Sequence, residues 1–187
     1  NQTYPLLEII LHEVQTEVML NKLSEGTLDA GILATPIEMT GLEEIILYTE
    51  PFYVATNSQH PFASKLSIKK EDLHGETLLL LEDGHCLRGQ ALDVCSDAMT
   101  KERKDFRGTS LETIRHMVSA GIGITLIPQT AIDYKNLIQN SSIKYIPFNE
   151  PAPARRVGLL FRETYTRKVC FQKLAVLIQS ITQKEFS

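Results

Sequence analysis

The chain has 187 residues, of which 43% are hydrophobic and 22% charged, an ordinary composition for a folded globular protein with a real core. Its net charge of −4, with no basic run longer than two residues, argues against a chain that grips a nucleic-acid backbone by itself. Apolar runs fall short of the roughly 18 residues of a membrane span, the first residues lack a signal-peptide pattern, and three cysteines fit a reducing compartment, so we expect a cytoplasmic protein.

The first half of the chain alternates strand and helix patterns, which predicts an α/β architecture. In order, we expect a strand ending near Val14, a helix that Thr16 caps and Gly26 stops, a buried strand at 30–34, and two extended pieces within 42–56 broken at Pro51.

The second half continues the alternation. We expect a buried strand at 78–81, a helix from about 87 to 99, a polar loop at 100–105, a helix from the Thr109–Glu112 capping box to Gly121, strands at 122–127, 145–148 and 157–161, and a C-terminal helix with an apolar stripe from Phe171 to Ile181.

Cys86 and Cys95 pose a geometric problem. If their segment is helical, nine steps of about 100° place the two side chains on opposite faces, with about 13.5 Å of rise between them. A disulfide needs Cα atoms within about 7 Å of each other. Bridging therefore requires the segment to change shape, which is how a redox switch would be built.

Cys86 is the candidate reactive thiol. His85 precedes it, Arg88 follows two residues later, and the predicted helix begins here, and all three features favour a thiolate. The alternative, a small buried hydrophobic residue, stays open from local features alone. For Cys95 in mid-helix and Cys170 on the C-terminal helix, core packing is the first expectation.

Other motifs are incomplete. His12-Glu13 lacks the second histidine of a zinc-protease motif, CxxC and GxSxG sequences are absent, and Gly121-Ile122-Gly123 lacks the third glycine of a dinucleotide fingerprint. His85 and the two nearby cysteines lack an evident fourth metal ligand. We expect no metal, no cofactor and no enzyme.

The stretches LEDGHCLR (81–88) with Cys95, and FRGTSLETIRHMVSAGIGITLIP (106–128), closely resemble the peroxide-sensing members of the LysR-type transcriptional regulators. The likeness runs through essentially the whole chain, including HEVQT (12–16) and the Pro153–Arg156 turn. Many LysR-type effector domains share the second signature, whereas the spacing GHC-x8-C is more specific to the peroxide sensors.

The resemblance implies a mechanism in which Cys86 is peroxidatic and Cys95 is resolving, so that a sulfenic acid becomes a disulfide. It also implies that Thr16, His85 and Arg156 bind hydrogen peroxide. A hydroxyl and an imidazole can hold the peroxide oxygens, while a guanidinium stabilises negative charge. Without the resemblance, Thr16 is equally explained as an N-cap and Arg156 as a surface strand residue.

The fold that the resemblance implies is a two-lobed, periplasmic-binding-protein-like effector domain whose lobes are joined by two crossover strands. We expect lobe I to comprise 1–49 plus 156–187 and lobe II to comprise 50–155, with crossings near 49–50 and 154–156. The N-terminal helix-turn-helix domain of the family and the first strand of its effector domain are missing, so we expect a fragment without DNA binding of its own.

The resemblance also implies partners. Refolding would alter a dimer interface and hence the DNA-binding geometry of an intact homotetramer, activating antioxidant genes with RNA polymerase, and a glutaredoxin-type reductant would reverse the reaction. Position 89 is Gly89, where enteric relatives have aspartate. A glycine costs a helix about 1 kcal/mol relative to alanine, so we expect it to ease refolding.

Three alternatives remain. A metabolite-binding LysR-type effector domain would respond to a small ligand instead of peroxide. A thiol peroxidase would consume peroxide catalytically. A plain interaction domain would have inert cysteines.

Overall fold

The computed structural model describes residues 7–37, 40–95, 101–132 and 142–185. Its helices are α1 (Thr16–Glu25), α2 (Cys86–Cys95), α3 (Leu111–Ser119) and α4 (Lys168–Glu185). Its strands are β1 (Ala30–Thr35), β2 (Leu42–Asn57), β3 (Thr77–Leu81), β4 (Lys101–Gly108), β5 (Thr125–Pro128), β6 (Ile143–Pro147) and β7 (Ala154–Arg162).

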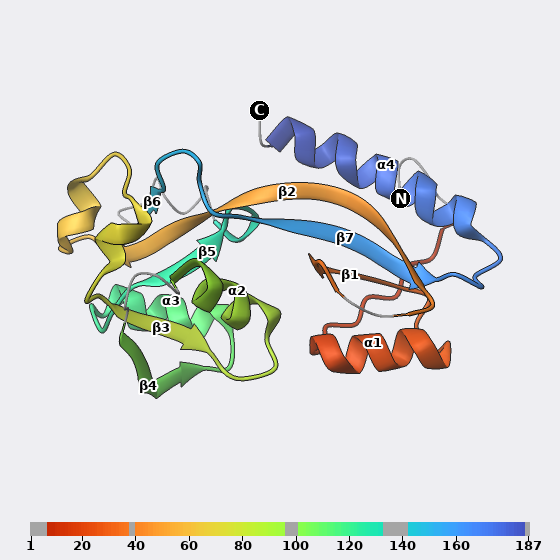
Figure 1. Cartoon of the computed structure of the whole chain (residues 1–187), viewed down its shortest axis with the longest axis horizontal. Coiled ribbons are helices and arrows are strands. Elements are labelled where there is room, and N and C mark those ends of the chain that lie inside the picture. The colour runs from red at the N-terminus through yellow and green to blue at the C-terminus, as the bar shows by residue number, and fades with distance from the viewer. Residues whose placement is uncertain (1–6, 38–39, 96–100, 133–141, 186–187) are drawn as a thin grey trace.

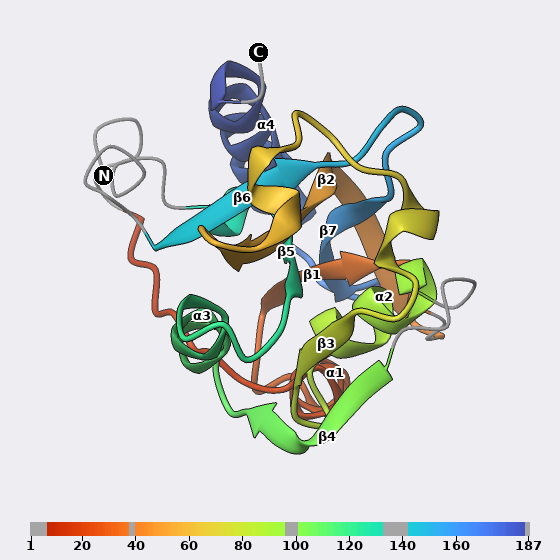
Figure 2. The same ribbon diagram turned by 90° about the vertical axis from the view of Figure 1, so that its left-hand side faces the viewer.

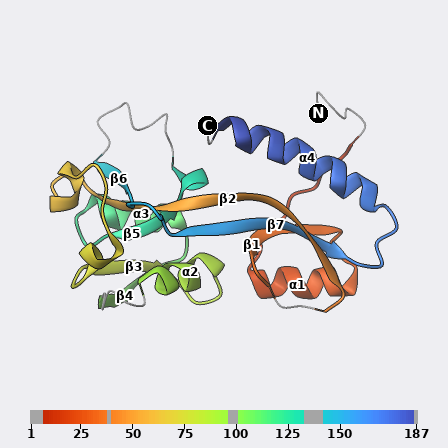
Figure 3. The same cartoon turned by 45° about the horizontal axis from the view of Figure 1, so that its top comes forward.

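Two long strands, β2 and β7, connect the two halves of the molecule (Figure 1). From Leu42 to Pro51, β2 pairs antiparallel with β7, and beyond Pro51 it pairs with β5 and β6 instead. One continuous strand therefore contributes to the sheets of both lobes, as Figure 3 also shows. This confirms the predicted two-lobed α/β fold with two crossover strands, while the lobe boundaries at 49/50 and 155/156 stay a prediction.

Lobe I places the β1–β7–β2 sheet between two helices (Figure 1). On the α1 side, Leu23 packs with Leu33 and Leu160, and Leu23 is fully buried. The α4 side has a separate apolar cluster, formed by Leu47, Val157, Leu159, Phe161, Phe171 and Ala175. The sheet is thus buried on both faces.

Lobe II is built from β3 to β6 with α2 and α3, seen end-on in Figure 2. β3 and β4 form a separate two-stranded parallel sheet, and a bridge from Leu78 to Ile124 links β3 to the segment that leads into β5. α2 contributes Ala91 and Cys95 to the same buried cluster as Leu80. The helix that carries the two cysteines of interest is therefore part of the lobe II core.

The predicted N-terminal strand is wrong, because residues 7–15 are irregular. Apolar side chains at both alternating positions are exposed there, including Ile9, Ile10 and Leu11. An alternating pattern becomes a strand when a neighbouring strand pairs with it and one face is covered. Among the described residues this segment has no such ladder.

Two further predictions are wrong because strand pairing occurs where the sequence pattern predicted none. Residues 101–105, expected to lie in a polar loop, belong to β4, which pairs with β3. Pro51 does not break β2, since its partner Ala154 continues the ladder with β7 and Phe52 donates its N–H to the Pro153 carbonyl. A proline is tolerated at this point because the partner strands of β2 change here.

Helix ends are close to expectation. Gly26 and Gly121 follow α1 and α3 with φ of 81° and 74°, as expected for glycines that stop helices. The N-cap of α3 is Ser110 rather than Thr109, and its hydroxyl accepts from the Thr113 N–H at 3.2 Å. The N-cap position of α1 is Gln15, so the prediction that Thr16 caps this helix is wrong by one residue.

Candidate redox site

The two cysteines lie at opposite ends of one ten-residue helix. Cys86 is the first residue of α2 and half-buried, Cys95 is the last and is buried, and no disulfide joins them. The predicted helix therefore exists, although it begins one residue earlier, and its expected continuation over 96–99 lies outside the described residues. Nine helical steps separate the Cα atoms by about 13.5 Å along the axis, roughly twice what a disulfide allows.

A sharp turn connects the end of β3 to Cys86. Gly84 has φ of 93°, a backbone conformation that favours glycine, and His85 and Cys86 follow directly. Cys86 sits in the first turn of α2, where backbone N–H groups lack helical carbonyl partners and the helix dipole favours negative charge. The local geometry therefore places Cys86 at the N-terminal end of α2, beside the turn at Gly84.

Arg88 has a different role from the one the sequence suggested. Its Nε lies 2.8 Å from Asp83 and its Nη2 2.9 Å from Glu102, and Nη1 donates to the Leu81 carbonyl at 3.3 Å. Two carboxylates thus balance the charge of Arg88. This charge is therefore not directed at Cys86, where the sequence had suggested that it favours a thiolate.

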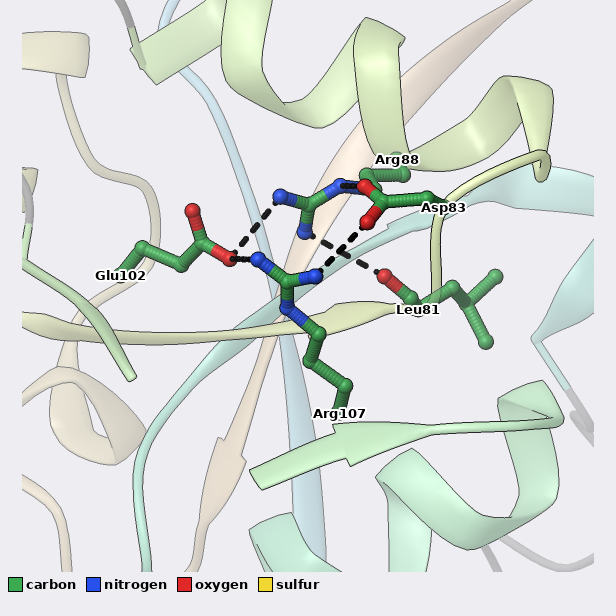
Figure 4. A network of polar contacts seen from close by, with 5 residues as sticks. All are labelled: Leu81, Asp83, Arg88, Glu102 and Arg107. Carbon is green, nitrogen blue, oxygen red and sulfur yellow. Dashed lines mark hydrogen bonds and ion pairs between the residues drawn. The ribbon is translucent and has the colours of Figure 1, made fainter. Parts of the chain in front are cut away.

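The contacts of Arg88 belong to a closed ring of four charges. Arg107 bridges the same two carboxylates, at 2.7 Å from Asp83 and 3.1 Å from Glu102. Figure 4 shows the two guanidinium groups side by side between Asp83 and Glu102. The ring joins the loop after β3, the first turn of α2 and strand β4, so it braces the segment that holds Cys86.

The HEVQT segment lies beside this loop. Gln15 side-chain atoms are 3.3 Å from where a Cβ on Gly84 would sit, which places the start of α1 in lobe I against the β3–α2 loop of lobe II. Figures 1 and 3 show these two elements facing each other from the two lobes. Thr16, next in sequence to Gln15, therefore begins the helix that follows this contact with the loop before His85 and Cys86.

Arg156 has its polar contacts in lobe I. Its Nε donates to the Thr35 hydroxyl at 3.1 Å, and its Nη2 lies 3.6 Å from Glu44. Successive strand residues point to opposite faces, and Arg155 is the member of the pair that is directed toward α2. Its Nη1 donates to the Gln90 amide oxygen at 3.3 Å.

Sequence reasoning missed a buried polar cluster at the crossing of the strands. Glu50 is fully buried and accepts from the Arg155 Nε at 2.8 Å and from the N–H and hydroxyl of Thr130 at 2.8 and 2.7 Å. The sequence did contain a signal for this cluster, because a carboxylate lies at one predicted crossing between the lobes and a pair of arginines lies at the other. Gln90 carried no comparable signal.

Cys170 is exposed on α4, so the expectation that it packs in the core is wrong. Across the described part of the chain, no group of three or more His, Cys, Asp or Glu residues is arranged to hold a metal ion. The helices described also include none that is long and apolar enough to cross a membrane.

Comparison with known proteins defines the class. The family model of the LysR substrate binding domain matches residues 1–180, and the chain belongs to this family. It is 42% identical over 180 residues to the DNA-binding transcriptional dual regulator OxyR of Escherichia coli K12, covering 96% of this chain and 58% of that protein. It is 40% identical over 183 residues to the hydrogen peroxide-inducible genes activator of Pectobacterium carotovorum, covering 98% and 60%. The chain thus spans about three fifths of the length of these relatives.

Solved structures agree with this assignment. The crystal structure of the oxidised form of OxyR superposes with a TM-score of 0.87 at 41% identity, covering all of this chain and 87% of that one. The reduced form gives the same TM-score at 40% identity, covering all of this chain and 86% of that one. The particular relatives that this chain is similar to are therefore OxyR proteins.

Proposed function

We propose that this chain is the regulatory domain of a hydrogen peroxide sensor of the OxyR type, acting in the cytoplasm. The observation that carries the proposal is the placement of Cys86 and Cys95 at opposite ends of α2 in a chain whose relatives are peroxide-inducible activators. A pair of thiols that must move to meet is suited to signalling, because the reduced and bridged states need different structures.

The chemistry needs only peroxide and the two thiols. The Cys86 thiolate attacks one peroxide oxygen, the O–O bond breaks, and hydroxide leaves and takes up a proton, which yields a sulfenic acid. The Cys95 thiol then attacks the sulfenic sulfur, and the disulfide forms with loss of water. One peroxide is reduced and two thiols are oxidised each time the disulfide forms, and the proposed role of the disulfide is to signal rather than to support sustained peroxide consumption.

Three residues would assist the first step. His85 is adjacent to Cys86 in the chain, and Thr16 begins the helix that lies against the same loop, so both can reach a peroxide bound there. For Arg156 the resemblance to peroxide sensors is the support, because its partners are Thr35 and Glu44. Their expected work is to hold the peroxide oxygens and to stabilise the charge on the leaving hydroxide.

The energetics suit a reversible switch. A ten-residue helix is marginal without tertiary contacts, and closing a loop of about ten residues by a disulfide is worth about 3 kcal/mol in the chain-entropy model. The gain from closure therefore offsets part of the cost of unwinding α2, which also loses its packing in the lobe II core. In the intact protein, the changed segment would alter dimer and tetramer contacts and so the binding of DNA and RNA polymerase, and a glutaredoxin-type reductant would restore the thiols.

Mapping of thiols by alkylation and mass spectrometry after about one equivalent of peroxide tests the proposal. Exposure alone predicts that Cys170 is lost first and the buried Cys95 last. The proposal predicts joint loss of Cys86 and Cys95 while Cys170 is retained, and Cys86→Ser should protect Cys95. Loss in order of exposure would contradict it.

A further inference from the structure

The crossing of β2 and β7 contains a buried polar cluster that has no part in the thiol chemistry. Glu50 on β2 and Arg155 on β7 are paired residues of adjacent strands and form an ion pair of 2.8 Å, with the Glu50 side chain fully buried. Thr130 supplies two further hydrogen bonds to Glu50. Both carboxylate oxygens are therefore satisfied, and Glu50 fixes one side of the Arg155 guanidinium.

The other side of the Arg155 guanidinium contacts α2, the helix that carries both cysteines. Arg155 Nη1 donates to the Gln90 amide oxygen at 3.3 Å, across 65 residues of sequence. Gln90 lies four residues after Cys86, one helical turn along the same face of α2, and inside the segment bounded by the two cysteines. Bridging Cys86 and Cys95 must unwind α2, so Gln90 cannot keep this position in the oxidised chain.

We infer that Gln90 is a positioning residue that couples the redox state of α2 to the interlobe crossing through Arg155. The inference rests on the proposed function, because it concerns the same disulfide. The Gln90–Arg155 hydrogen bond stabilises the helical dithiol form, and its loss on oxidation frees the Arg155 guanidinium from α2, while the ion pair with Glu50 remains. By linkage, the crossing strands and the thiol–disulfide equilibrium then influence each other equally.

The first arm of the test is the reduction potential of the Cys86–Cys95 pair, measured in glutathione buffers with alkylation of the remaining thiols. Gln90→Ala removes the bond and should favour disulfide formation about five-fold, which lowers the potential by about 20 mV at roughly 30 mV per tenfold. Alanine is the better helix former, so a merely structural Gln90 predicts the opposite sign. Gln90→Glu, which offers Arg155 a charged acceptor, should raise the potential.

The second arm asks whether the effect passes through Arg155. Arg155→Lys keeps a positive charge beside Glu50 but removes the forked donor, so it should shift the potential in the same direction as Gln90→Ala. The double variant should shift it no further than the larger single change, because both remove one contact. Additive shifts would overturn the coupling.

The third arm reads the crossing itself, by hydrogen exchange of the reduced protein over 48–52 and 154–157. Gln90→Ala should speed exchange there, whereas the control Gly89→Ala, at a position with no neighbour within 4 Å of the added methyl, should not. A wild-type chain that forms no Cys86–Cys95 disulfide would overturn the proposed function together with this coupling. A wild-type disulfide whose potential is unmoved or raised by Gln90→Ala would overturn the coupling alone.

Discussion

Two helices of equal length are held in different ways. α1 and α2 each have ten residues, but α1 is anchored by the fully buried Leu23 and by Gly26 at its end, and Arg162 donates to the Leu23 carbonyl. The buried residues of α2 are small and its larger apolar side chains pack against the lobe II core only half-buried, it contains Gly89, and its first turn is tied by charges. A buried apolar side chain loses its stabilisation when it is exposed to water, whereas polar groups that leave each other can form hydrogen bonds with water instead, at little net cost. α2 is therefore the helix that can be released.

The largest expected effect tests the anchoring of α1. Leu23→Ala should lower the free energy of unfolding by about 2–5 kcal/mol, because a fully buried leucine leaves a cavity. Leu92→Ala on α2, where the leucine is only half-buried, should cost at least about 1 kcal/mol less. Urea unfolding of the reduced proteins measures both, and equal losses would remove the contrast.

The charge ring gives the next effect. Glu102→Gln leaves Arg88 and Arg107 facing each other with one shared carboxylate, and should cost about 1–2 kcal/mol after allowance for partial exposure. Asp83→Asn is the matched control, since Asp83 is 74% exposed and should cost less than about 1 kcal/mol. If thermal unfolding ranks the two in the reverse order, the ring is not a brace of α2.

Gly89 should set how easily α2 unwinds. Gly89→Ala should stabilise the reduced protein by about 1 kcal/mol and slow disulfide formation, because the methyl group enters open space and only helix propensity changes. Gly89→Asp should act in the same direction. Stopped-flow oxidation with peroxide measures the rates, and an unchanged rate and dose response in Gly89→Asp would refute the idea that this glycine eases refolding.

The smallest effect concerns Tyr48, on β2. Burial, and secondly the charge of Glu50, raise the pKa of Tyr48 above its ordinary value of 10.0. The folded state therefore holds this proton more tightly than the unfolded state, so its contribution to stability is present below pH 10 and is lost as pH rises through the folded pKa. Tyr48→Phe should show a flatter decline of unfolding free energy above pH 10 than the wild type, and identical slopes would contradict the shift.

The sequence predicted those parts of the fold that depend on local pattern. Gly26 and Gly121 end helices because glycine tolerates positive φ, and the leucines of β3 are buried as their continuous apolar run indicates. Features that depend on pairing with a distant segment were not predicted from the sequence. The polar β4 is a strand because β3 lies beside it, and the apolar residues 7–11 are exposed because no strand covers them among the described residues.

The candidate site likewise has features that could be predicted from the sequence and features that could not. The separation of Cys86 and Cys95 follows from helix geometry and was visible in the spacing alone. The contact of Arg155 with Gln90 and its ion pair with Glu50 join residues 65 and 105 positions apart, so only the crossing of the strands brings them together. Cys170 was misjudged because its apolar neighbours said nothing of which face of α4 it occupies.

Hydrogen exchange of α1 and α2, compared before and after formation of the Cys86–Cys95 disulfide, tests the central claim most directly. The account predicts that amides over 86–95 lose protection on oxidation while those over 16–25 keep theirs. A disulfide that forms with the α2 amides still protected, or equal loss of protection in both helices, would contradict it.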